Sequence, residues 1–335
     1  MKHLWLIVCF ILLLACKKES ETLKIEPPPV YKGTGEIDGL ELIYYRTYLA
    51  ESFNSICFTD VNTGFVGCYS GAIYKTTDGG FNLEKQETNA KGEVSDIFFL
   101  NKDEGFAVAG NSLIHTINGG AVWTEIKLPL VEKTYIKSVC FVNKLVGFVV
   151  GSATIFSTTN GGISWETRTF PNTVGYMKDV EFANEKVGLI VDTFGRHFLT
   201  KDGGKNWSVS TPNEGGWSVS ISVVNENIFY FGGNSGICKS VDQGSTWSIF
   251  PEGPKEVASV VFKSEKNGFA FGLGFYSGGD FGQTYGAIYY TTSGGNYWKG
   301  SKRLTNTYVI SEASFPLENI GFAICSNMII KIVRL

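Results

Sequence analysis

Five acidic residues carry the chemistry in this chain that could cleave a glycosidic bond. Two carboxylates about 5–9.5 Å apart can serve as the general acid and as the nucleophile or base of that reaction. The plausible candidates are Asp96, Asp179, Asp192, Asp280 and Glu312. They are spread along the chain, and no two of them form a favoured pair. A glycoside hydrolase is therefore the alternative function, and a non-catalytic binding module is the leading interpretation.

Metal and cofactor chemistry has less support in the sequence. Beyond the first 15 of 335 residues, histidine occurs only at His115 and His197, in different repeats. No metal site can be assembled from them by spacing. No cofactor motif is present, so neither a metal nor a cofactor is expected. Lys and Arg total 29 against 32 Asp and Glu, with no basic stripe, which argues against a nucleic-acid partner.

The elements that must position these residues form a repeat of strand, tight turn and aromatic residue. It occurs six times, at Tyr74–Leu83, Ile114–Trp123, Ile155–Trp165, Leu199–Trp207, Lys239–Trp247 and Tyr290–Trp298. The corner residues of the turns are Asp78, Asn118, Asn160, Asp202, Asp242 and Ser293, in steps of 40, 42, 42, 40 and 51. Asp or Asn accepts backbone N–H bonds at such a corner, and the following glycines supply positive φ. A period of about 40–50 residues with this content predicts a β-propeller.

The number of blades follows from an alignment of the units. In six of them an inner-strand Phe lies six residues before a Gly: Phe58/Gly64, Phe99/Gly105, Phe141/Gly147, Phe182/Gly188, Phe262/Gly268 and Phe315/Gly321. Unit 5 departs, with Ser222 and Ile228 in those places. Seven inner strands but six turn motifs leave the last unit one strand short. The unassigned strand at residues 40–48 can complete it and hide the edges.

We therefore expect one all-β domain over residues 39–335, a seven-bladed β-propeller with Asp-box turns. The N-terminal strand completes the last blade and closes the ring. A six-bladed ring with a spare strand pair is the alternative. The five cysteines beyond Cys16 are expected to be buried thiols, although a bridge between Cys57 and Cys68 is conceivable. A monomer is expected.

The repeat resembles the Asp-box (BNR) repeat, S/T-x-D-x-G-x-x-W, of sialidases, sortilin-type receptors and several glycoside hydrolases. The strand before the box that begins Gly-Phe, as in GFVGCYSGAIYKTTDGG at Gly64–Gly80, is closer to the photosystem II stability/assembly factor-like family. The resemblance covers about Ser55 to Leu335. It implies a propeller whose repeats are scaffold, and a role in binding or assembly.

The arginines argue against a sialidase, which would need three of them around a substrate carboxylate. The candidates are Arg46, Arg168, Arg196, Arg303 and Arg334. Two of these, Arg46 and Arg168, fall on outer strands, and Arg334 lies at the end of the chain. Too few remain near a common site.

The N-terminal segment indicates export. Residues 1–15 combine Lys2 with an apolar run too short to span a bilayer, and Leu13–Cys16 resembles the bacterial lipobox. On this interpretation Cys16 takes the lipid and anchors the protein in the bacterial cell envelope, at the outer membrane on its periplasmic or surface side. Residues 16–38 would be a flexible tether. An ordinary secretory signal or a membrane anchor is the alternative.

A ligand is expected on the face built by the links between blades and by the loops between second and third strands. The links and those loops supply Tyr69, Asn111, Tyr135, Tyr176, Asp192, Phe194, Arg196, Trp217, Asn234 and Tyr308. The sixth such loop, at Gly272–Gly286, is long and adds Phe275, Tyr276, Asp280, Phe281 and Tyr285. Its Gly and aromatic content is typical of a recognition loop, and a cover over the funnel is the alternative.

A rim of polar residues is expected around the funnel, three residues before each inner-strand Phe. Its acidic members are Asp96, Asp179 and Glu312, and Val219 holds the place in unit 5. The rim could hydrogen-bond a ligand or could simply be solvated. The expected partner is an envelope protein complex, or a glycan or peptide ligand. The tether and anchor would hold the domain at a membrane.

Overall fold

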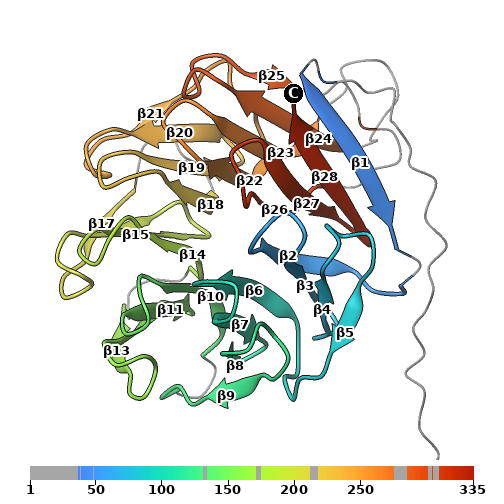
Figure 1. Cartoon of the computed structure of the whole chain (residues 1–335). Coiled ribbons are helices and arrows are strands. Elements are labelled where there is room, and N and C mark those ends of the chain that lie inside the picture. The colour runs from blue at the N-terminus through green and yellow to red at the C-terminus, as the bar shows by residue number, and fades with distance from the viewer. Residues whose placement is uncertain are drawn as a thin grey trace, which may run out of the picture.

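The computed structural model describes residues 37, 39–47, 49–130, 134–170, 175–211, 218–274, 285–300, 304 and 309–335. Within these ranges, 28 strands form seven four-stranded antiparallel sheets, set as blades around a central axis (Figure 1). The predicted seven-bladed β-propeller is therefore confirmed. The expected signal segment, Cys16 and the tether, except Ile37, lie outside the described residues. No helix that could span a membrane occurs in the described part of the chain.

Each blade runs in chain order from an inner strand to an outer strand, and the last blade borrows its outer strand from the N-terminus. Blades 1 to 3 comprise β2 (Phe53–Phe58), β3 (Gly64–Cys68), β4 (Ile73–Thr76) and β5 (Glu84–Gln86); β6 (Val94–Phe99), β7 (Gly105–Ala109), β8 (Ser112–Thr116) and β9 (Thr124–Ile126); β10 (Ile136–Phe141), β11 (Gly147–Gly151), β12 (Thr154–Thr158) and β13 (Glu166–Thr169). Blades 4 and 5 comprise β14 (Met177–Phe182), β15 (Gly188–Asp192), β16 (His197–Thr200) and β17 (Ser208–Ser210); β18 (Ser218–Val223), β19 (Phe229–Gly233), β20 (Gly236–Ser240) and β21 (Ser248–Ile249). Blades 6 and 7 comprise β22 (Val257–Phe262), β23 (Gly268–Gly274), β24 (Tyr285–Thr291) and β25 (Lys299–Gly300); β26 (Glu312–Ser314), β27 (Ile320–Cys325), β28 (Met328–Arg334) and β1 (Leu40–Arg46).

The ring closes as predicted, through β1. This strand pairs antiparallel with β28 over its whole length, from Leu40 opposite Arg334 to Arg46 opposite Met328 (Figure 1). Beyond β1, the Thr47 hydroxyl donates a hydrogen bond to the carbonyl of Asn327 at 2.8 Å. The first and last parts of the domain are thus joined in one sheet, which removes the edge that β28 would otherwise expose.

The Phe–Gly pairs of the sequence set the packing between blades. Phe58 lies across Gly64, where a Cβ would come within 2.6 Å of the ring, so a larger residue does not fit. The same ring stacks on Phe322 of blade 7 at 3.6 Å between centroids. Glycine on one strand therefore lets the neighbouring Phe lie flat and fill the space between two blades.

Blade 5 corrects the sequence alignment by one residue. There Val223, not Ser222, lies opposite Phe229, not Ile228. The large and small partners have changed places in this blade, so the Phe–Gly spacing that guided the alignment was missing. Ser220 consequently holds the rim position that the alignment gave to Val219.

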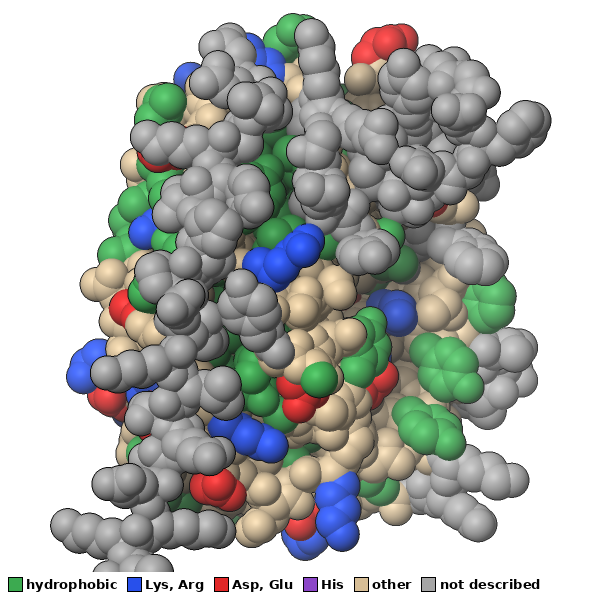
Figure 2. All heavy atoms as spheres, turned by 90° about the vertical axis from the view of Figure 1, so that its right-hand side faces the viewer, with side chains coloured by type: hydrophobic (Ala, Val, Ile, Leu, Met, Phe, Trp, Pro, Cys, Tyr) green, Lys and Arg blue, Asp and Glu red, His purple; other side chains and the backbone are tan. Residues whose placement is uncertain are grey.

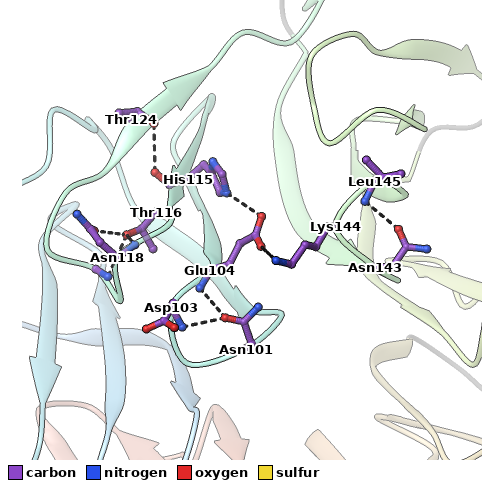
Figure 3. Close-up of polar contacts among 11 residues, drawn as sticks. Asn101, Asp103, Glu104, His115, Thr116, Asn118, Thr124, Asn143, Lys144 and Leu145 are labelled. Carbon is purple, nitrogen blue, oxygen red and sulfur yellow. Dashed lines mark hydrogen bonds and ion pairs between the residues drawn. The ribbon is translucent and has the colours of Figure 1, made fainter.

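The box turns are closed by their own hydrogen bonds. In blade 2 the Thr116 hydroxyl accepts from the Gly120 N–H at 2.9 Å and donates to the Asn118 Oδ1, which accepts from the Val122 N–H at 2.9 Å (Figure 3). Trp123 at the end of this turn meets Phe99 edge-on at 6.1 Å. The motif is scaffold, as its resemblance implied.

Two further features concern the charged side chains of the outer wall and the cysteines. On the part of the outer wall beside β1 that Figure 2 shows, Lys and Arg side chains are interspersed with Asp and Glu side chains. Cys57, Cys68, Cys140, Cys238 and Cys325 are free thiols, so Cys57 and Cys68 are not bridged.

Candidate ligand-binding face

A bulge recurs in the inner strands and shapes the mouth of the funnel. In β2, β6, β10, β14, β18 and β22 the ladder skips one residue: Asn54, Ser95, Lys137, Lys178, Val219 and Ala258. A bulge re-aims the extra side chain, and all six line the central cavity of about 480 Å³. Strict alternation along a strand hides such a residue, which is why the sequence did not reveal this ring.

The three acidic rim residues line the same cavity, but each is already engaged by the scaffold. One carboxylate oxygen of each accepts a backbone N–H from the next blade: Asp96 from Val139 at 2.8 Å, Asp179 from Ile221 at 2.8 Å and Glu312 from Ile56 at 3.1 Å. In blade 5 the Ser220 hydroxyl accepts from the Val260 N–H in the same way at 3.2 Å. Because a serine hydroxyl can accept the same bond as a carboxylate, we interpret these contacts as structural hydrogen bonds that join neighbouring blades.

A second set of such inter-blade hydrogen bonds lies two residues further along the inner strands. Its acceptors are Glu181, Ser222 and Ser314, which accept from Val223, Phe262 and Phe58 at 2.7, 2.8 and 2.9 Å. Burial raises the pKa of Asp96 to about 7 and that of Glu312 well above its usual range. Such carboxyls are candidates for acid chemistry in general, but here their contacts explain them as structural links.

A second hollow of about 620 Å³ adjoins the funnel over blades 2 to 4. We call it the Tyr–Lys groove and define it by Asn111, Tyr135, Lys137, Tyr176, Lys178 and Thr193. Lys137 and Lys178 line both hollows, so the groove and the funnel meet at these two residues. The structure thus brings together three residues that the sequence predicted for a ligand face: Asn111, Tyr135 and Tyr176.

The two tyrosines are exposed, but their backbone is held firmly. Tyr135 is 56 % exposed and Tyr176 is 52 % exposed. The carbonyl of Tyr135 accepts from the Ser152 N–H at 2.8 Å, and the carbonyl of Tyr176 accepts from the Thr193 N–H at 2.9 Å. The backbone that carries the two rings is therefore fixed, so binding has to restrict only the side-chain rotation, which lowers its entropic cost.

The groove contains one paired and one unpaired ammonium group. Lys137 Nζ lies 2.7 Å from Glu93 Oε1, whereas Lys178 has no hydrogen bond or ion pair within the ranges described above. Burial, and then the nearby charge of Lys137, lower the pKa of Lys178.

Two other residues predicted for the ligand face, Asp192 and Arg196, stabilise a turn. Asp192 is buried, and its Oδ1 accepts from the N–H groups of Phe194 and Arg196, both at 2.9 Å. Its Oδ2 accepts from Arg196 Nε at 2.6 Å. This pair holds the turn between β15 and β16 and leaves the half-exposed Phe194 ring on the surface.

The remaining candidates are divided between the funnel and the undescribed residues. Tyr69 and Asn234 line the funnel. Trp217, Phe275, Tyr276, Asp280, Phe281, Tyr308 and the side chain of Tyr285 lie outside the described residues. The predicted sixth loop is partly strand, because β23 continues to Gly274 and β24 begins at Tyr285.

On the opposite face, a cluster joins blades 2 and 3. Glu104 lies between His115 and Lys144, with Oε1 3.4 Å from His115 Nε2 and Oε2 3.9 Å from Lys144 Nζ (Figure 3). Among the described residues, no group of three or more His, Cys, Asp and Glu side chains could hold a metal ion.

Comparison with known proteins finds one family model that matches part of the chain. Residues 128–210 match the family model described as photosynthesis system II assembly factor YCF48. The matched stretch contains blades 3 and 4. They are also the blades that supply both tyrosines and both lysines of the groove. No curated protein sequence matches the chain.

Solved structures share the fold at low identity. A structure of YCF48 bound to a D1 peptide superposes with a TM-score of 0.70 at 16% identity, over 88% of this chain and 97% of that chain. YCF48 from Cyanidioschyzon merolae gives 0.65 at 17% identity, over 86% and 98% of the two chains. A streptogramin B lyase gives 0.70 at 13% identity, over 88% and 97%. At these identities the likeness concerns the fold.

Proposed function

We propose that this protein is a non-catalytic binding module of the assembly-factor type, which holds a peptide segment of a partner protein in the Tyr–Lys groove. The observation that carries the proposal is the groove itself, with two fixed and half-exposed tyrosines beside two lysines. Aromatic side chains with few rotamers are frequent anchors in recognition surfaces.

Two comparisons support this choice of ligand. The family match covers the two blades that build most of the groove. A protein of the same fold has been solved with a bound peptide. The rim carboxylates, in contrast, are engaged between blades, so we do not assign them to hydrolysis.

The proposal is tested by site-specific photo-crosslinking in cells. A photoreactive phenylalanine analogue replaces Tyr176 in one variant and Tyr297 in a matched control. Tyr297 is 67 % exposed and belongs to a box turn, which lies on the other face. We expect the Tyr176 variant to crosslink to one segment of one protein, and the synthetic segment to bind the purified chain. Equal crosslinking from Tyr297, or a crosslinked segment that does not bind, contradicts the proposal.

We further propose that the domain works at the bacterial cell envelope, anchored through lipid on Cys16, at the outer membrane on its periplasmic or surface side. The lipobox-like ending of the N-terminal segment supports this. A Cys16→Ser variant is expected to lose incorporation of labelled fatty acid and to leave the membrane fraction. Labelling that persists in this variant contradicts the anchor.

A further inference from the structure

A Tyr–apolar–Lys triplet occurs twice in neighbouring blades. It is Tyr135-Ile136-Lys137 in blade 3 and Tyr176-Met177-Lys178 in blade 4. In both copies the tyrosine is half-exposed, the middle residue is buried and the lysine is the bulge residue. The groove thus contains two equivalent positions side by side.

The two copies differ in what faces the lysine. Lys137 pairs with Glu93, which directly precedes β6 of the previous blade. The residue at the same place relative to Lys178 is Tyr135, which directly precedes β10 and has no carboxylate. Lys178 therefore lacks the direct ion pair that the repeat gives to Lys137, although the charges of Glu93 and Asp179 favour its ammonium form from further away. A half-buried ammonium without a partner is costly, and a ligand carboxylate would remove that cost.

We propose that Lys178 pairs with the carboxylate of an Asp or Glu side chain inside the bound peptide, and that Tyr135 and Tyr176 hold an adjacent aromatic or aliphatic side chain. This rests on the proposed function and adds the chemistry of the partner. The groove lining extends from Asn111 of blade 2 to Lys178 and Thr193 of blade 4. A peptide can therefore run through the groove, which favours an internal side chain over a chain end.

Charge limits where that carboxylate can lie. Asp179 lines the adjoining funnel. Burial raises its pKa only to about 6, so it is mostly ionised at neutral pH and would repel an anion that moved deeper. Lys178 stands at the junction of the two hollows, so the carboxylate stays in the groove.

The test uses the full-length protein on an array of randomised 12-residue peptides with amidated ends. We expect the bound peptides to be enriched in Asp or Glu next to an aromatic or aliphatic residue. Replacing that acid by Asn or Gln in the best peptide should weaken binding at least about tenfold, as loss of a partly desolvated charge pair does. Lys178→Gln should weaken the same peptide similarly, and Lys178→Arg should stay within about threefold. Lys102→Gln, at an exposed turn on the other face, is the matched control and should change nothing.

The outcomes separate the two proposals. If wild type binds no peptide, the proposed function fails. If it binds peptides without an acid preference, or if Lys178→Gln binds as wild type does, only the present inference is overturned. A requirement for a free peptide carboxyl terminus, or a preference for acidic sugars over peptides, also overturns it.

Discussion

Replacing Asp96 by Asn is expected to stabilise the protein at alkaline pH and not at acidic pH. Asp96 is half-buried in the funnel, and burial raises its pKa from 3.8 to about 7. A carboxyl that ionises less easily in the folded chain contributes stability below its unfolded pKa, and this contribution is lost as the pH rises through the folded value. Asparagine keeps an oxygen that can accept the Val139 N–H and removes the charge.

The magnitude follows from the same pKa. A shift from 3.8 to about 7 corresponds to at most about 4 kcal/mol, at about 1.4 kcal/mol per pH unit. Because Asp96 is partly open to solvent, we discount this to about 2 kcal/mol. Asp96→Asn should therefore exceed wild type by about 2 kcal/mol in unfolding free energy at pH 8, and the difference should vanish near pH 4.

The assay is urea unfolding followed by circular dichroism at several pH values. Asp103→Asn removes the same charge from an exposed turn and should stay within about 0.5 kcal/mol of wild type. If Asp96→Asn is less stable than wild type at pH 8, or differs from it equally at all pH values, the account of the rim carboxylates is wrong.

Three further predictions concern the scaffold. Trp165→Ala should lower the free energy of unfolding, measured in urea, by about 3 kcal/mol, because the indole meets Phe141 edge-on and its N–H donates to the Gly162 carbonyl. A change under about 1 kcal/mol would contradict this. Deleting Leu40–Arg46 should lower the melting temperature in one cooperative step, because β28 loses its partner; an unchanged melting curve would refute the closure. His197 is buried, burial lowers its pKa to about 3, and neither ring nitrogen has a partner among the described residues. His197→Leu should therefore stabilise by about 1 kcal/mol at pH 7, with a larger gain below pH 6.5, and a loss of stability there would count against this explanation.

The fold could be predicted because most of its local signals recur from blade to blade. The box turn and the Phe–Gly pair each follow from hydrogen bonding or packing that recurs in six of the seven blades, and the leftover N-terminal strand follows from the one blade that lacks a box turn. Blade 5 was aligned one residue out because Val223 and Phe229 exchange the large and small roles there. A repeat can thus be aligned from the sequence where the same pair of residues recurs. The alignment fails where a different pair of residues fills the same space.

The candidate site could be predicted only in part. Tyr135 and Tyr176 could be named as candidates because aromatic residues stand out in polar links, and both line the Tyr–Lys groove. Lys137 and Lys178 were missed because a bulge turns them into the funnel mouth, and bulges leave no mark on the alternation of a strand. Asp96, Asp179 and Glu312 line the central cavity, but their backbone partners belong to other blades, and no single unit reveals those contacts.

The most direct test of the groove is the affinity of the array-selected peptide for tyrosine variants. Tyr135→Ala and Tyr176→Ala should each raise the Kd at least about tenfold, as loss of an aromatic anchor does. Both rings are half-exposed, so the melting temperature should barely change. Tyr297→Ala, which removes an exposed tyrosine from the opposite face, should bind as wild type does. Unchanged affinity in the two groove variants, or an equal loss in Tyr297→Ala, would contradict the assignment of the Tyr–Lys groove as the binding site.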